Sequence, residues 1–135
     1  MIGAGAIGCE LLKNYAMLGL GTSGKITLTD PDVIEVSNLN RQFLFREKHL
    51  RKPKSQTAAA AAIQMNSHLK DRVEARLDKV CDDTLAVYNE SFFKSQSIVT
   101  NALDNVKARL FIDAQCIASK TALIDSGTLG PKGHV

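Results

Sequence analysis

The glycine-rich segment at the start of the chain, Gly3-Ala4-Gly5-Ala6-Ile7-Gly8, restricts the fold more than any other part of the sequence. Glycines at this spacing allow a tight turn and a close approach of the backbone to phosphate, while the helix that follows presents unpaired N–H groups. Such a loop ordinarily follows a buried strand of about five residues. The segment therefore predicts a strand, a turn and a helix arranged to bind a nucleotide.

Strand and helix patterns alternate along the rest of the chain. Strand patterns occur over residues 25–29, 72–77, 97–103 and 121–125, where 72–77 alternates like a half-buried strand and 97–103 is an apolar strand. Helices are predicted between them: from Ile7 to Leu18, over residues 55–65, over a short segment containing Leu85, Val87 and Tyr88, and after the cap residue Asn105. Parallel strands joined by helices form a doubly wound sheet. We therefore predict an α/β, Rossmann-like fold with a mainly parallel sheet and helices on both faces.

The carboxyl ends of the predicted strands should carry the ligand, as they do in other doubly wound sheets. This rule brings the glycine loop together with Asp30, the residues after Leu77, and Asp104. Asp30 lies 22 residues past Gly8, where a carboxylate can accept hydrogen bonds from both ribose hydroxyls. A glycine loop with such an acid also suits an NAD-dependent dehydrogenase, so these two features leave the reaction open.

Composition excludes several other classes of protein. The 135 residues are 44% hydrophobic and 23% charged, as in an ordinary globular domain. The net charge of +3 is too small to indicate nucleic acid, and no apolar run is long enough to cross a membrane. The three cysteines form no C-x-x-C pair, which fits a reducing compartment. We expect no nucleic-acid or membrane partner, and a cytoplasmic and nuclear location.

A polar segment about thirty residues after the glycine loop indicates which of two reactions is favoured, hydride transfer or attack on a polyphosphate. Between Ser37 and Phe45 the chain places three polar side chains near the strand end that carries Asp30: Asn38, Arg41 and Gln42. Lys54 follows at the predicted start of the alanine-rich helix, and Asp104 ends a strand opposite the glycine loop. Cations that offset phosphate charge and a carboxylate that can hold Mg²⁺ suit attack on a polyphosphate. Hydride transfer needs none of these groups, so the sequence favours attack on ATP.

Four segments carry a resemblance to a known family: Gly3 to Asn14, Ser37 to Phe45, Ala102 to Asn105, and Ser126 to Thr128. Together they resemble the active (second) adenylation domain of ubiquitin-activating enzymes. That family belongs, in the ThiF- and MoeB-like superfamily, with the bacterial adenylating enzymes for the molybdopterin and thiamine sulfur carriers. Met65-Asn66 combined with Tyr88 to Phe93 favours the ubiquitin type over the SUMO or other ubiquitin-like types.

The resemblance implies a role for each matching residue. The nucleotide loop contains Gly3, Gly5 and Gly8, and the ribose-binding carboxylate is Asp30. The other residues implied to contact ATP are Asn38, Arg41, Gln42 and Lys54, with the backbone near Val80 reading adenine. The implied Mg²⁺ ligand is Asp104. The implied catalytic residues are therefore Arg41, Lys54 and Asp104, and the implied cofactors are ATP and Mg²⁺.

The resemblance also implies a reaction and a set of partners. The C-terminal carboxylate of ubiquitin attacks the α-phosphate of ATP, which gives ubiquitin-adenylate and pyrophosphate, and a cysteine thiolate then takes the ubiquitin as a thioester. The implied partners are ubiquitin or a ubiquitin-like protein, the inactive adenylation half of the same enzyme, and a ubiquitin-conjugating enzyme recruited by a ubiquitin-fold domain.

The two ends of the chain predict a fragment of such an enzyme. Only Met1 and Ile2 precede the glycine loop, and the residues from Gly127 to Val135 stop in mid-pattern. Residues 1–135 would then be a partial adenylation domain that lacks the catalytic-cysteine and ubiquitin-fold domains. The three cysteines of the chain stand at the wrong positions to be the catalytic one: Cys9, Cys81 and Cys116. We expect this fragment to retain much of a nucleotide site and to be a poor enzyme alone.

Three alternative functions compete with this interpretation. The first is an activating enzyme for another ubiquitin-like modifier or for a sulfur-carrier protein. The second is a scaffold half with a decayed nucleotide site, against which the joint presence of Asp30, Arg41, Lys54 and Asp104 argues. The third is a dehydrogenase, which lacks an evident acid or base for the nicotinamide side.

Overall fold

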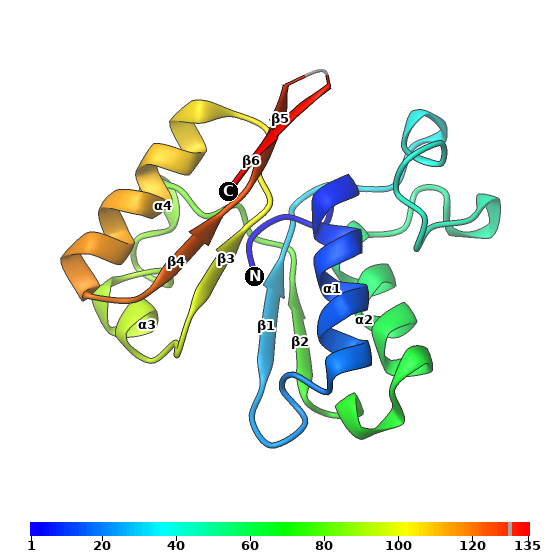
Figure 1. Ribbon diagram of the computed structural model, residues 1–135, viewed down its shortest axis with the longest axis horizontal. Helices are drawn as coiled ribbons and strands as arrows, with labels where there is room; N and C mark the ends of the chain where they lie inside the picture. The colour runs from blue at the N-terminus through cyan, green and yellow to red at the C-terminus, as the bar shows by residue number, and fades with distance from the viewer. Residues whose placement is uncertain (130) are drawn as a thin grey trace.

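The computed structural model, which describes residues 1–129 and 131–135, places parallel strands between two groups of helices (Figure 1). Strand β1 (Ile26–Thr29) pairs with β2 (Val73–Arg76) in parallel. Strand β3 (Val99–Asn101) pairs with β4 (Leu123–Asp125), also in parallel. Ile2 forms parallel bridges to β1 and to β3, so that the order across the sheet is β2, β1, Ile2, β3, β4. This is the strand order of a doubly wound sheet.

Ile2 occupies the central strand position although only one residue precedes it. Its N–H donates to the carbonyl of Thr100 at 2.9 Å, and its own carbonyl accepts from the N–H of Ala102 at 2.8 Å. On the other side, the N–H of Gly3 donates to the carbonyl of Thr29 at 2.9 Å. Backbone bonds to both neighbours therefore fix the start of the glycine loop between β1 and β3.

Helices cover both faces of the sheet, as the sequence predicts. Helices α1 (Ala6–Leu18) and α2 (Lys54–Met65) pack together beside β1 and β2. Helices α3 (Glu90–Lys94) and α4 (Val106–Ser119) pack together beside β3 and β4 (Figure 1). The first helix ends at Gly19, whose φ of 74° is a left-handed conformation that glycine adopts without strain.

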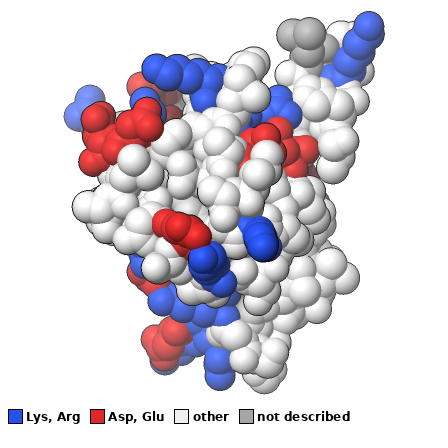
Figure 2. Space-filling view, turned by 90° about the vertical axis from the view of Figure 1, so that its left-hand side faces the viewer, with Lys and Arg blue, Asp and Glu red and all other residues white. Residues whose placement is uncertain are grey.

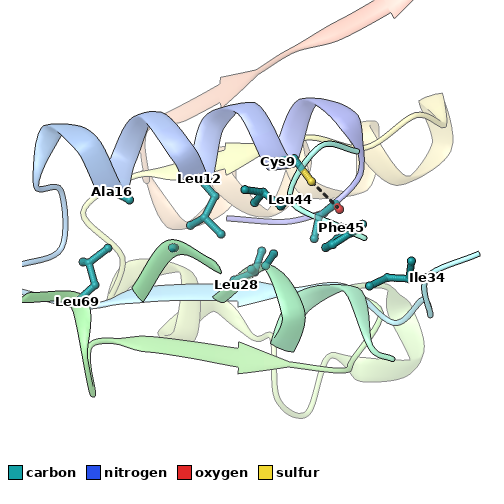
Figure 3. Packing of buried hydrophobic residues seen from close by; sticks show 11 residues of the cluster. Cys9, Leu12, Ala16, Leu28, Ile34, Leu44, Phe45 and Leu69 are labelled. Carbon is teal, nitrogen blue, oxygen red and sulfur yellow. Dashed lines mark hydrogen bonds between the residues drawn. The ribbon is translucent and has the colours of Figure 1, made fainter. Parts of the chain in front are cut away.

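The first hydrophobic core lies between α1, α2 and β1 (Figure 3). Leu12 and Ala16 of α1 face Leu28 of β1, and all three side chains are fully buried. The alanines of α2 leave room for close packing, since Ala58 and Ala62 are buried in the same cluster. This core sets the distance between α1 and the sheet, and thereby the position of the glycine loop.

The second core lies on the opposite face of the sheet. It contains Ile2 and Val99 of the sheet, Ile112 of α4, and the aromatic side chains of Tyr88 and Phe93. Together the two cores hold the strands so that their carboxyl ends, including the glycine loop and Asp30, lie at one edge.

The segment between β2 and α3 differs from its prediction, because the helix expected around Leu85 to Tyr88 does not form. A 3₁₀ turn at Asp82–Thr84 is followed by α3, which begins only after Asn89. The side chain of Asn89 accepts the N–H of Phe92 at 3.0 Å and caps α3 there. Two short strands at the end of the chain, β5 (Gly127–Leu129) and β6 (Lys132–His134), form an antiparallel pair that the sequence does not predict.

The outer face of α4 carries several apolar side chains. Val106, Leu110 and Ile117 are 68%, 63% and 70% exposed and point away from both cores. Figure 2, which looks onto the side of the molecule that carries α3 and α4, shows scattered charges around a largely uncharged surface. Among the described residues, no helix has the length and apolar character needed to cross a membrane.

Candidate nucleotide site

The glycine loop connects Ile2 to α1, and its three glycines have different surroundings. Gly3 has a φ of 96°, and a Cβ there would lie 2.7 Å from the carbonyl oxygen of Ala102. A Cβ on Gly8 would overlap the carbonyl oxygen of Gly3. In contrast, a Cβ on Gly5 would meet only the side-chain nitrogen of Gln42, at 3.9 Å. Gly3 and Gly8 thus allow the loop to fold, and Gly5 leaves open space where a ligand can approach.

The N-terminus of α1 faces this open space without a side-chain cap. Gly5 is the N-cap residue and offers no side-chain acceptor to the first turn of the helix. The first N–H of the helix that bonds back to Gly5 belongs to Cys9, at 2.9 Å. Unpaired N–H groups and the helix dipole favour an anion at such a position.

Asp30 connects the end of β1 to the glycine loop. One carboxylate oxygen accepts the N–H of Ala4 at 2.7 Å, and the other accepts the N–H of Asp32 at 2.9 Å. Burial raises the pKa of Asp30, and the two N–H donors and the nearby Lys54 oppose that shift. The carboxylate is therefore held in a fixed orientation, with acceptor capacity left for a ligand's hydroxyls.

Lys54 begins α2 and turns toward the same strand end. Its ammonium lies 2.8 Å from a carboxylate oxygen of Asp32, and its backbone N–H donates to the carbonyl of Asp32 at 2.9 Å. The Lys54 side chain is only 10% exposed, whereas that of Asp32 is 64% exposed. The sequence analysis predicts no site role for Asp32. The Asp-x-Asp spacing at the end of a strand was the available signal.

Two of the predicted residues of the polar segment are buried, and one is not. Asn38 is buried, and its side-chain oxygen accepts the N–H of Glu35 at 2.9 Å, which shapes the turn. Gln42 is buried beside Gly5, and its side-chain oxygen has no partner among the described residues. Arg41 is exposed, and its guanidinium donates to the carbonyl of Ser37 at 2.7 Å. The structure thus brings Gln42 to the glycine loop and leaves Arg41 on the surface of the turn.

Asp104 lies on the other side of the glycine loop. It follows β3 in an exposed position, one residue before Asn105, whose side chain caps α4 by accepting the N–H of Ala108 at 2.8 Å. The preceding residues Ala102 and Leu103 approach Gly3. Within the described ranges, no group of three or more acidic, histidine or cysteine side chains could hold a metal ion by itself. A single exposed carboxylate suits Mg²⁺, which usually takes one or two carboxylates together with phosphate oxygens and water.

Val80 lies beyond the end of β2, on the other side of Asp30. The residue as a whole is 4% exposed and belongs to the second core. The carboxyl edge therefore presents the predicted residues in the order of the strands: Val80 after β2, Asp30 after β1, the glycine loop after Ile2, and Asp104 after β3. A cavity of about 410 Å³ has Lys25, Thr27, Arg76 and Ser97 among its lining residues, and none of the predicted site residues lines it.

The thiols of Cys9 and Cys116 are unsuited to nucleophilic attack. Burial raises the pKa of Cys9 to about 11, and its thiol lies 3.7 Å from the carbonyl oxygen of Ala4 (Figure 3). Burial also raises the pKa of Cys116. Since the thiolate is the reactive form, both groups remain protonated and inert at neutral pH.

Asp30→Asn is expected to weaken nucleotide binding by about tenfold or more, because a charged acceptor for hydroxyl groups is lost. The raised pKa of Asp30 also predicts a pH dependence, since acid protonates the carboxylate and removes acceptor capacity. ATP affinity should fall as the pH decreases through that pKa, and the fall should be smaller in Asp30→Asn. Titration calorimetry between pH 4.5 and 8 would measure the ATP affinity of the wild type and of the variant at each pH. The variant also serves as the control for protonation of the ATP phosphates themselves.

The same substitution has an expected effect on folding. Because the pKa of Asp30 is raised in the folded chain, the stabilising contribution of this group is fully present below its unfolded pKa and is lost as the pH rises through its folded pKa. The unfolding free energy of the wild type relative to Asp30→Asn should therefore decrease with rising pH in that range. An equal pH dependence in both proteins would contradict the account of Asp30.

Comparison with known families gives matches that cover the chain from end to end. The family model described as the ThiF family matches residues 1–135. Human ubiquitin-like modifier-activating enzyme 6 is 56% identical over 137 residues, and human ubiquitin-like modifier-activating enzyme 1 is 54% identical over 137 residues. These alignments cover 99% and 100% of the chain and 13% of each relative. The chain thus spans about one eighth of the length of the curated relatives it matches.

Solved structures of the same shape include a bacterial enzyme. The E. coli tRNA N6-threonylcarbamoyladenosine dehydratase, TcdA, is similar with a TM-score of 0.80 and 29% identity, over 92% of this chain and 48% of that chain. The same dehydratase has been solved in complex with AMP and in complex with ATP, each with a TM-score of 0.79 to this chain. An α/β Rossmann-like fold is therefore common to both proteins.

Proposed function

The chain belongs to the ThiF family, and from that premise we propose that it forms the ATP site of an enzyme that adenylates the C-terminal carboxylate of ubiquitin. The observation that carries the proposal is the convergence of Gly5, Asp30, Gln42 and Lys54 at one edge of the sheet. Identities of 54% and 56% to enzymes named for activating ubiquitin-like modifiers support the substrate class. The ATP and AMP complexes of TcdA support the nucleotide.

In the proposed site ATP lies along the carboxyl edge. Its triphosphate lies against Gly5 and the N-terminus of α1, its ribose hydroxyls donate to Asp30, and its base lies near Val80. Lys54 lies beside this path, and its ammonium can turn from Asp32 to a phosphate because Asp32 is largely in solvent. Arg41 would reach the phosphates only after leaving the carbonyl of Ser37.

The proposed reaction needs positioning and charge neutralisation more than proton transfer. A carboxylate oxygen of the carrier protein attacks the α-phosphorus of ATP, the bond to the β-phosphate breaks, and pyrophosphate leaves. The attacking carboxylate is already ionised at neutral pH, so no general base is required. Lys54 and Arg41 offset the repulsion between the two anions. Asp104 is the residue that would hold Mg²⁺, which supplies further charge neutralisation to phosphate oxygens when bound.

The thioester step and the further partners of the proposed enzyme fall outside the described site. We assign the thioester to a cysteine outside residues 1–135, since the buried thiols of Cys9 and Cys116 are inert and the family resemblance implies a catalytic cysteine in a separate domain. Residues 1–135 are proposed to be a partial adenylation domain that works beside an inactive adenylation half. A ubiquitin-conjugating enzyme would bind through another domain, in the cytoplasm and nucleus.

A second candidate is the activation of a different carrier protein, which the 56% identity to an enzyme named for activating ubiquitin-like modifiers supports. Exchange of radioactive pyrophosphate into ATP by the complete polypeptide tests both candidates. Ubiquitin is expected to stimulate exchange, and purified ubiquitin-like proteins and sulfur carriers are expected to stimulate it less. Stimulation by a sulfur carrier but not by ubiquitin would overturn the proposed substrate, and no stimulation by any carrier would overturn the proposed reaction.

A test with residues 1–135 alone examines the partial-domain proposal separately. This chain is expected to bind ATP with little or no ubiquitin-dependent exchange. Full turnover by residues 1–135 would contradict the proposed need for a second adenylation half.

A further inference from the structure

We propose that Arg109 is a positioning residue for the reaction, whose guanidinium fastens α4 to the end of β4 and thereby holds Asp104 where it can bind Mg²⁺. The inference rests on the proposed function, because it assumes that Asp104 holds the metal beside a bound triphosphate. It goes further by assigning a part in metal binding to an ion pair at the end of the neighbouring strand.

Asp104 lies in a short connection between β3 and α4. On the strand side, the N–H of Ala102 donates to the carbonyl of Ile2 at 2.8 Å, which fixes the connection to the centre of the sheet. On the helix side, Asn105 caps α4. Asp104 itself is exposed, so its position follows from how firmly the start of α4 is held.

Arg109 joins the second turn of α4 to the end of β4. Its Nε donates to both carboxylate oxygens of Asp125, at 3.1 and 2.8 Å, and its Nη2 lies 2.6 Å from Oδ2. The two side chains are 19% and 30% exposed, and a forked pairing of this kind is stronger and more directional than an exposed single contact. The backbone N–H of Arg109 donates to the carbonyl of Asn105 at 3.2 Å. The ion pair is thus linked to the turn that follows Asp104.

The end of β4 that receives Arg109 is itself fixed to β3. Asp125 pairs in register with Asn101, the last residue of β3. The N–H and the hydroxyl of Ser126 both donate to the carbonyl of Asn101, at 3.3 and 3.2 Å. The connection that carries Asp104 is therefore tied at both of its ends to the same point of the sheet.

A glycine beside the ion pair leaves space for the guanidinium. A Cβ on Gly127 would lie 2.5 Å from Nη1 of Arg109, so a larger residue there would displace the guanidinium from its place. On another side, Nη2 of Arg109 lies 3.1 Å from Nε2 of His134. The proposed ATP contacts do not use the segment from Ser126 to Thr128, and the packing of Arg109 explains why it contains a glycine.

Arg109→Lys in the complete polypeptide tests the inference, because lysine keeps the charge and loses the planar fork. Calorimetric titrations with ATP, in EDTA and in saturating Mg²⁺, measure how much the metal strengthens ATP binding. We expect most of this Mg²⁺-dependent gain to be lost, since groups that orient a metal ligand commonly account for about tenfold or more of metal affinity. ATP affinity in EDTA should change by less than about twofold, because the glycine loop and Asp30 keep their contacts.

A double-mutant cycle separates the positioning of Asp104 from a general structural role. Asp104→Asn alone should remove the Mg²⁺-dependent gain, and adding Arg109→Lys to it should cause no further loss. Asp125→Asn, which removes the charge of the partner, should reproduce the effect of Arg109→Lys. Lys107→Arg is the matched control, because it makes the reverse exchange at an exposed position of the same helix, and it should leave the gain unchanged.

Three results would overturn the inference. The first is an unchanged Mg²⁺-dependent gain in both Arg109→Lys and Asp125→Asn. The second is an equal loss of ATP affinity with and without Mg²⁺, as a general disturbance of the fold would cause. The third is a wild type that binds ATP equally well with and without Mg²⁺, which would leave the proposed ATP site standing. A wild type that does not bind ATP at all would contradict the proposed function together with the inference.

Discussion

Lys54→Met is expected to lower ubiquitin-dependent pyrophosphate exchange by about a hundredfold or more. Removing a single preorganised group that stabilises developing charge typically has an effect of this size. Methionine fills a similar volume, and Lys54 is buried at the start of α2, so the fold should be retained. Its partner Asp32 is 64% exposed and can be hydrated once the ion pair is lost.

The matched control for this variant is Lys52→Met, two residues earlier on the exposed loop before α2. It removes the same charge near the same strand end and is expected to change the exchange rate by less than about threefold. Initial rates at saturating ATP and ubiquitin would separate the two proteins. Equal losses in Lys52→Met and Lys54→Met would mean that only the general charge of the loop matters, which contradicts the role assigned to Lys54.

Gly8→Ala is expected to lower the free energy of unfolding by about 3 kcal/mol, at the upper end of the range for overpacking. A Cβ at this position would overlap the carbonyl oxygen of Gly3, which is backbone and cannot rotate away. The glycine loop is also bonded to β1 and β3 on both sides, so it cannot move without breaking backbone hydrogen bonds. Urea denaturation followed by circular dichroism measures the change.

Gly5→Ala is the contrasting variant, because its added methyl group meets only the flexible end of Gln42 at 3.9 Å. Its unfolding free energy should stay within about 1 kcal/mol of the wild type, since the site is open. Its nucleotide affinity should fall, because the methyl group occupies the space left for the phosphates. Comparable destabilisation by both alanines would show that Gly5 is a folding residue and would remove the basis for placing phosphate there.

The parts of the fold that follow from local patterns were predicted well from the sequence. The segment from Ile26 to Thr29, in which Ile and Leu alternate with Thr, forms β1, and the alanine-rich stretch forms α2 from Lys54 to Met65. The segment from Leu85 to Tyr88 was predicted incorrectly as a helix. There the hydroxyl of Thr84 accepts the N–H of Cys81 in a local turn, and Tyr88 is buried in the second core and bonds Asp78, so turn and core contacts override the helix propensity.

The candidate site was predicted as a set of residues, but the contacts between them were not. Asp30 and Gly5 lie where the strand-end rule places them. The partnership of Lys54 with Asp32 depends on where α2 begins relative to β1, which no spacing in the sequence specifies. The surface position of Arg41 likewise follows from the turn at Ser37, whose carbonyl holds the guanidinium.

Hydrogen–deuterium exchange of the complete polypeptide with and without ATP tests the central claim most directly. The account predicts that ATP slows exchange at the carboxyl edge, in the glycine loop around Gly5, at Asp30, and in the segment around Val80. Protection centred instead on the cavity lined by Lys25, Thr27 and Ser97, or no protection at any of these segments, would contradict the placement of the nucleotide.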